Sequence, residues 1–160
     1  MRKLPLTAIA ILGLMGTASM SASAATTKTQ ERHFTEVLVG ARVSTTGSRY
    51  ENVYRVKESP DAGGAAIQDA ALKGSSYPVG AQDTMIAFFR DGAQTTSDTY
   101  TLGPPSTSGI GAISGNGTCI HGSGIHVKET CTFTIKGNYN LTTSVTQLTL
   151  TGTYTRPTRH

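Results

Sequence analysis

Apolar and polar residues alternate with a period of two along most of this chain, and turn residues interrupt the alternation at short intervals. Successive side chains of a β-strand point to opposite faces, so this period is typical of strands with one buried face. Many short strands separated by Gly-rich and Pro-rich turns predict an all-β fold. The strand candidates lie near Phe34–Val43, Arg49–Lys57, Ala65–Leu72, Thr84–Arg90, Thr95–Leu102, Ile110–His121, His126–Ile135 and Val145–Thr155.

The alternation also divides the residues of each candidate strand between two faces. The strand near Thr84–Arg90 is apolar on both faces, and Asp91-Gly92 after it is a strong hairpin signal. The alanine-rich segment 65–73 fits a strand and a short helix about equally. Elsewhere we expect one apolar face, formed by Val37, Val39, Ala41 and Val43 in the first strand, by Tyr50, Tyr54 and Val56 in the second, by Cys131, Phe133 and Ile135 in the seventh, and by Leu148, Leu150 and Tyr154 in the eighth.

Regular spacing of the eight strands predicts a small, closed, antiparallel up-and-down β-barrel. A Greek-key β-sandwich is the alternative, because it also consists of short strands with turn signals between them. The sequence has no internal repeat of fixed period, so a repeat architecture is not predicted.

The N-terminus has the order of a cleavable secretory signal. Arg2 and Lys3 precede an apolar run from Leu4 to Met15, and small residues follow, ending in Ala22-Ser23-Ala24. The apolar run is shorter than the roughly 20 residues of a membrane span. We therefore predict a secreted or periplasmic protein with no membrane span after cleavage, divided into a signal peptide (1–24), a flexible lead-in (25–33), one β-barrel domain (34–156) and a tail (157–160).

The charge of the chain excludes a nucleic-acid partner. Lys and Arg number 14 against 10 Asp and Glu, which gives a formal net charge of +4. Loss of Arg2 and Lys3 with the signal leaves 12 basic residues and a net charge of +2. Those 12 are scattered, with no stripe that could follow a phosphate backbone. We interpret the locally basic segment Arg156–His160 as a frayed terminus. Nothing in the sequence indicates the oligomeric state.

Cys119 and Cys131 are the two cysteines of the chain. An even number of cysteines in an exported protein predicts a disulfide, and two sulfurs alone make a poor zinc site. If the turn of the hairpin lies at Gly122–Gly124, the two residues fall on neighbouring strands and the bond fixes their register. Closing so short a loop contributes roughly 3 kcal/mol in the chain-entropy model.

The overall plan resembles a known family. A signal peptide, eight short strands and a Gly-rich late hairpin, from Gly115-Asn116-Gly117-Thr118 to Gly122-Ser123-Gly124, resemble the small barrels related to allene oxide cyclases and dirigent proteins. This resemblance implies an eight-stranded barrel with an apolar central cavity. It assigns no catalytic residue, because no family motif aligns residue by residue. Lipocalins are a worse match, since they usually carry a Trp in the first strand and this chain has none.

Five residues are candidates for a ligand site inside such a barrel. Tyr50, Tyr54, Met85 and Phe89 supply large apolar or aromatic surfaces on alternating positions. Asp69 shares its strand parity with Ile67 and Ala71. If that face points inward, burial raises the pKa of the carboxyl group, which could then act as a base. If the segment bulges or forms a helix, Asp69 lies at the surface.

Other chemistry-bearing motifs are weak, and we predict neither a metal nor a cofactor. His121 and His126 flank the tip of the disulfide hairpin without a carboxylate between them. The chain has no G-x-S-x-G elbow, and no helix follows Gly115 and Gly117 as a nucleotide motif requires.

Three functions from different classes therefore stay open. The first is a non-catalytic barrel that binds a small apolar ligand in an internal cavity. The second is an extracellular surface or interaction protein with a filled core and an exposed apolar patch. The third is a cyclase- or isomerase-like enzyme, which needs an acid such as Asp69 inside the cavity.

Overall fold

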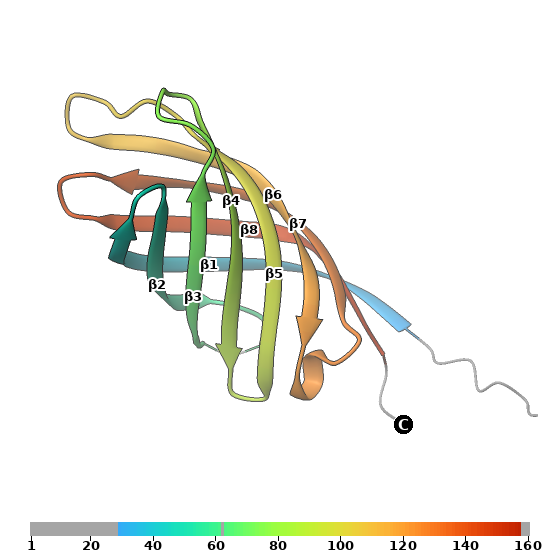
Figure 1. The fold of residues 1–160 in the computed structure, drawn as a ribbon. Helices are drawn as coiled ribbons and strands as arrows, with labels where there is room; N and C mark the ends of the chain where they lie inside the picture. The colour runs from blue at the N-terminus through green and yellow to red at the C-terminus, as the bar shows by residue number, and fades with distance from the viewer. Residues whose placement is uncertain (1–28, 62, 158–160) are drawn as a thin grey trace, which may run out of the picture.

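The computed structural model describes residues 29–61 and 63–157, so the predicted signal peptide lies outside the described residues. Eight antiparallel strands follow one another around a closed barrel, and the last strand pairs with the first (Figure 1). The up-and-down barrel is thus confirmed, and the sandwich alternative is wrong. The strands are β1 (Thr29–Thr46), β2 (Arg49–Glu58), β3 (Ala65–Leu72), β4 (Val79–Phe89), β5 (Gly92–Leu102), β6 (Ile110–Gly122), β7 (Thr130–Asn140) and β8 (Val145–Pro157).

Several strand boundaries differ from those that the sequence predicts. β1 begins at Thr29, because its first residues pair with the end of β8, from Thr29↔Pro157 onward. Residues 29–33 are therefore strand and not a flexible lead-in. The alanine-rich segment is strand β3, since it pairs on both sides with β2 and β4. A 3₁₀ turn at Gly124–His126 replaces the predicted start of β7.

In β1 the residues that face the barrel interior are not the valines that the sequence predicts, but those at the alternate positions. Leu38 is fully buried and Glu36 nearly so, whereas Val43 is 60% exposed. The outer face therefore carries Val37, Val39, Ala41 and Val43, a correction to the predicted apolar face. In β2, β7 and β8 the predicted apolar faces are confirmed as core, and in β4 the core face is formed by Met85, Ala87 and Phe89.

Inward-facing glycines allow large tyrosine rings to cross the barrel interior. Gly115 pairs with Tyr100, and a Cβ atom on Gly115 would lie 2.4 Å from the Tyr100 Cβ. Gly111 pairs with Tyr139, and its Cβ would lie 2.3 Å from the ring. Real Cβ atoms do not approach other atoms so closely, so both positions require glycine. Each of these glycines thus leaves the space that the tyrosine side chain of the neighbouring strand occupies.

The two ends of the barrel differ in character. The hairpins β1–β2, β3–β4, β5–β6 and β7–β8 surround an open end, whereas β2–β3, β4–β5, β6–β7 and the outer ends of β1 and β8 form the other end (Figure 1). Polar side chains fill this second end around Arg156. The Arg156 guanidinium lies 2.8 Å from Asp61 and 2.6 Å from Glu129. Arg156 is thus an ordered ion-pairing residue of β8, and the predicted frayed terminus is wrong at this position.

His126 and Glu36 complete the closed end. His126 Nδ1 lies 3.3 Å from Glu129, and the imidazole packs 5.0 Å from the Phe89 ring. Glu36 accepts a hydrogen bond of 2.8 Å from the Ser59 hydroxyl. Burial raises the pKa of Glu36 above its ordinary value. His121, by contrast, is exposed, so the two histidines of the hairpin do not form a pair.

The predicted disulfide joins Cys119 to Cys131, with Cα atoms 5.0 Å apart. It lies next to the last bridge between β6 and β7, Thr118↔Thr132, and therefore ties the two strands where their pairing ends. Cys131 is buried beside Phe133 in the core, and Cys119 is half-buried. Neither sulfur is free to act as a nucleophile or metal ligand.

The ion pairs of Arg156 make a testable contribution to stability. Arg156→Met leaves the carboxylates of Asp61 and Glu129 without their partner at a largely buried site, so we expect the free energy of unfolding to fall by about 3 kcal/mol. Arg49→Met is the matched control, because it removes an exposed ion pair with Asp69 and should change stability by about 0.5 kcal/mol or less. Urea unfolding of both variants measures the difference, and equal losses would contradict a special role for Arg156.

Candidate functional site

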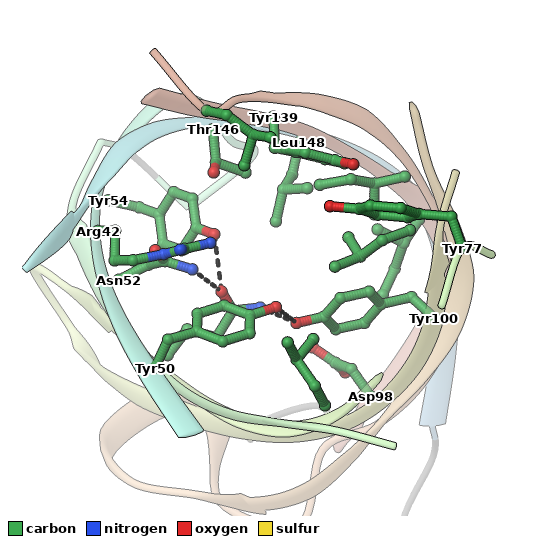
Figure 2. A pocket seen from close by; sticks show the side chains of 16 residues that line it. Arg42, Tyr50, Asn52, Tyr54, Tyr77, Asp98, Tyr100, Tyr139, Thr146 and Leu148 are labelled. Atoms are coloured by element: carbon green, nitrogen blue, oxygen red, sulfur yellow. Dashed lines mark hydrogen bonds between the residues drawn. The ribbon is translucent and has the colours of Figure 1, made fainter. Parts of the chain in front are cut away.

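A cavity of about 110 Å³ opens at the end of the barrel opposite Arg156. Aliphatic side chains and tyrosine rings form most of its lining, and polar side chains project among them (Figure 2). Every strand except β4 contributes to the lining, so the closed barrel itself shapes the cavity. The walls contain Leu72, Leu102, Ile113, Ile135, Leu141 and Leu148, and the polar lining contains Arg42, Tyr50, Asn52, Tyr54, Gln68, Tyr77, Asp98, Tyr100, Tyr139 and Thr146.

The structure brings only two of the five predicted site residues together. Tyr50 and Tyr54 lie on the inner face of β2 and line the cavity. Met85 and Phe89 are buried in the core of the barrel but do not line it. Asp69 points outward and pairs with Arg49 on the outer face, so its predicted place inside the cavity is wrong. In β3 the inward parity belongs to Ala66, Gln68 and Ala70.

Gln68 is the centre of the polar floor. Its Oε1 accepts hydrogen bonds of 2.7 Å from Asn52 Nδ2 and of 2.7 Å from the Tyr54 hydroxyl. Its Nε2 donates to Asp83 and, at 3.5 Å, to the Tyr100 hydroxyl. This one amide therefore connects side chains from β2, β4 and β5 and holds the floor in one arrangement.

Two aspartates face each other beneath the floor. Asp83 and Asp98 are direct cross-strand partners of β4 and β5, 4% and 2% exposed. Burial raises the pKa of Asp98 to about 8, and the nearby Asp83 adds to the shift. Burial also raises the pKa of Asp83, to about 6. The Oδ1 atoms of both residues have no hydrogen-bond partner. Because the two residues are direct cross-strand partners, a proton shared between their carboxyl groups would satisfy both atoms.

A pair of tyrosine hydroxyls lies above the aspartates. The hydroxyls of Tyr50 and Tyr100 are 2.7 Å apart, and both rings line the cavity. Burial raises the pKa of Tyr50 and of Tyr100 above the ordinary value. Both hydroxyls therefore stay protonated and serve as neutral hydrogen-bonding groups of the site.

Arg42 and two tyrosines form the mouth of the cavity. The Arg42 guanidinium lies 4.8 Å from the centre of the Tyr50 ring. Tyr77 and Tyr139 stack with ring centres 6.5 Å apart and an interplanar angle of 11° (Figure 2). The Tyr139 hydroxyl donates a hydrogen bond of 2.7 Å to the Gly103 carbonyl, which ties the mouth to the β5–β6 loop.

Gln68, Asp83 and Asp98 are not among the site residues that the sequence predicts, although strand parity could have placed the two acids on the inner face. Asp83 lies two residues before the core residue Met85, and Asp98 lies two residues before Tyr100. A period of two therefore places both acids on the inner face once the core residues are known. Their pairing depends on the register of the β4–β5 hairpin. Phe89 pairs with Gly92, so the turn is Arg90-Asp91 and not Asp91-Gly92, the turn that the sequence indicates.

No known family model, curated protein or solved structure matches the chain. Within residues 29–61 and 63–157, no three His, Cys, Asp or Glu side chains are grouped as metal ligands. In the same ranges no helix is long and apolar enough to cross a membrane.

The buried acid pair predicts a specific dependence of stability on pH. Asp98 keeps its proton in the folded state up to about pH 8, whereas the unfolded chain loses it near pH 4. The folded protein therefore binds more protons in this window, and the free energy of unfolding falls as the pH rises. Asp98→Asn removes the titrating proton and can still donate to Asp83, so the slope should shrink by roughly 1.4 kcal/mol per pH unit.

Urea unfolding between about pH 4.5 and about pH 7.5 measures this slope. Asp69→Asn is the matched control, because it removes a carboxyl group from the outer face of the barrel. Equal slopes in the wild type and Asp98→Asn would show that the pair does not hold a proton through this range.

Proposed function

We propose that this protein is a non-catalytic binding barrel that takes a small, mainly apolar molecule into its cavity. The observation that carries the proposal is a cavity at an open barrel end that is lined by aliphatic side chains and tyrosine rings, with hydrogen-bonded polar groups among them. Such a combination is typical of sites for small molecules, where apolar walls provide affinity and polar groups provide orientation. Because the floor is already hydrogen-bonded through Gln68, binding requires little reorganisation.

The volume limits the size of the ligand. A cavity of about 110 Å³ is somewhat smaller than an engineered apolar cavity of about 150 Å³ that holds benzene. The enclosed part of the cavity therefore takes at most a single ring, and the rest of such a ligand extends through the open mouth. Larger ligands would require movement of the side chains around the open end.

Filling the cavity from its rim tests this proposal. Leu72 lines the cavity and is half-buried at the end of β3, so Leu72→Trp places an indole in the ligand space. Ile67→Trp is the matched control on the same strand, at a position 47% exposed on the outer face. The probe is para-xylene, a ring of suitable size without polar groups.

At about tenfold excess over Kd, ligand binding stabilises the folded state by roughly 1.4 kcal/mol, which raises Tm by several degrees. We expect this rise in the wild type and in Ile67→Trp, and its loss in Leu72→Trp. Thermal unfolding with and without the probe measures the effect. An unchanged Tm of the wild type at saturating probe would contradict a binding cavity.

A second candidate function is acid–base catalysis on a bound molecule, as in a cyclase or isomerase. The acid pair Asp83–Asp98 favours it, because Asp98 lines the cavity and its pKa is raised to about 8. A carboxyl group that stays protonated near neutral pH can serve as a general acid. In this role Asp98 takes the place that the sequence analysis gave to Asp69.

An interaction protein is the remaining alternative. The outer face of β2, β3 and β4 carries exposed apolar residues in register, with Val53 beside Ile67 and Ile67 beside Ile86. Exposed patches of this kind occur at protein–protein contacts. We rank this function below ligand binding, because the interior contains a cavity instead of a filled core.

We further propose that the protein is exported to the periplasm or the extracellular medium. The N-terminal charge, apolar run and Ala22-Ser23-Ala24 support this proposal, and the Cys119–Cys131 disulfide is compatible with an oxidising compartment. The intact mass of the protein recovered from culture medium or periplasm should correspond to a chain that starts at Ala25. Recovery from the cytoplasm with residues 1–24 retained would contradict export.

A further inference from the structure

We propose that two copies of this chain associate through the outer face of β2, β3 and β4, with an apolar row at its centre and opposite charges on its two sides. The apolar row consists of Val53, Ile67 and Ile86, one residue from each of the three neighbouring strands (Figure 1). The row lies on the side wall of the barrel, away from the hairpins that surround the cavity mouth. The proposal concerns assembly and is independent of what the cavity binds.

The apolar row is exposed and continuous. Val53, Ile67 and Ile86 are 42%, 47% and 38% exposed, and Phe88 on β4 is 45% exposed. Ile67 is the cross-strand partner of both Val53 and Ile86, so the three side chains form one surface. Removal of such a surface from water is favourable, and contiguous apolar patches of this kind mark sites of association.

The outer faces of β7 and β8 show that this barrel does not need apolar residues on its outside. Threonine occupies most of their outward positions, namely Thr130, Thr132, Thr134, Thr149, Thr151, Thr153 and Thr155. Threonine favours the strand conformation as valine and isoleucine do, and its hydroxyl group remains hydrated. The branched aliphatic residues of the apolar row are therefore not a requirement of strand formation, and a second apolar surface explains them.

Charges of opposite sign flank the apolar row. Glu51 and Asp69 are cross-strand partners on one side of it, and Arg55 lies on the other side. Asp69 is paired with Arg49. Glu51 and Arg55 form no ion pair with any residue in the ranges 29–61 and 63–157. Each copy thus presents one unpaired acid and one unpaired base, two residues before and two residues after Val53.

Two-fold symmetry makes this face complementary to itself. If the strands of the partner run in the opposite direction, Val53 faces the partner's Val53 and Glu51 faces the partner's Arg55. The symmetry repeats the second contact, because residues that meet across an isologous interface meet twice. If the strands ran in the same direction, with β2 over β4, Asp69 would face the partner's Asp69. Charge therefore favours the reversed arrangement.

The size of the face sets the strength of the dimer. The apolar row spans only three strands, so the interface belongs to the small, weak class of protein contacts. Arg49 faces the partner's Lys57 in the reversed arrangement, and the ion pair of Arg49 with Asp69 offsets this repulsion. We expect a reversible dimer with a Kd on the order of 10 µM.

Charge reversal tests the assigned contact. Glu51→Arg and Arg55→Glu each replace two attractive contacts of the dimer by two repulsive ones, so each should weaken self-association by roughly tenfold or more. Lys136→Glu is the matched control, because it reverses an exposed charge on the outer face of β7 and should leave the dimer unchanged. Sedimentation velocity from about 1 µM to about 500 µM protein measures each Kd.

A mixture of the two single variants provides the sharpest test. In a mixed pair, the arginine introduced at position 51 faces the glutamate introduced at position 55. Arg55 of the first variant also faces Glu51 of the second. Two chains that associate poorly with themselves should therefore form a heterodimer with close to the wild-type affinity, and the double variant should recover self-association in the same way.

Several results would overturn the proposal. These are a wild type that stays monomeric at about 500 µM, single reversals that leave the dimer intact, and a mixture that does not associate. Val53→Lys places two like charges together on the symmetry axis, so a dimer that survives this substitution would also contradict the assigned face. All three altered positions are exposed, and an unchanged Tm checks that the variants fold. A monomer that still binds para-xylene would overturn the dimer alone and leave the proposed ligand-binding function in place.

Discussion

The pairing of β1 with β8 is the constraint on which the rest of the structure depends. It extends from Thr29↔Pro157 to Ala41↔Val145 and closes the sheet into a barrel. Closure removes the two sheet edges and turns one face of each strand toward the barrel interior. Away from the open end, a polar group on that face is costly unless it finds a partner inside. The network around Gln68 is the consequence of this requirement.

Closure also separates the buried ion pairs from the cavity along the barrel axis. At one end the ion pairs of Arg156 with Asp61 and Glu129 occupy the interior and leave little space. At the other end hairpin loops leave the cavity open, and Arg42 is free of acidic partners within the described residues. A substitution at the mouth should therefore have little effect on the ion pairs that hold the far end together.

Sequence patterns predicted the strands, the disulfide and part of the core, because these depend on residues that are close together in the chain. The site was only partly predictable. Asp69 was placed inside by parity with Ile67, yet the register between β2 and β3 turns both residues outward. Arg156 looked like part of a loose tail, and its partner Asp61 is 95 residues away. Contacts of this kind depend on closure, which no local pattern encodes.

The buried acid pair shows how the cavity and the fold oppose each other. Two carboxyl groups that face one another in the interior cost stability, because each disfavours ionisation of the other and both lose their hydration. A filled aliphatic interior would avoid that cost. Gly117 instead leaves room for Asp98, since a Cβ there would lie 2.2 Å from the carboxylate. The sequence around this site thus accommodates a polar floor that the barrel does not need for its own stability. Buried acids with raised pKa values beside a cavity are an arrangement that occurs preferentially at functional sites.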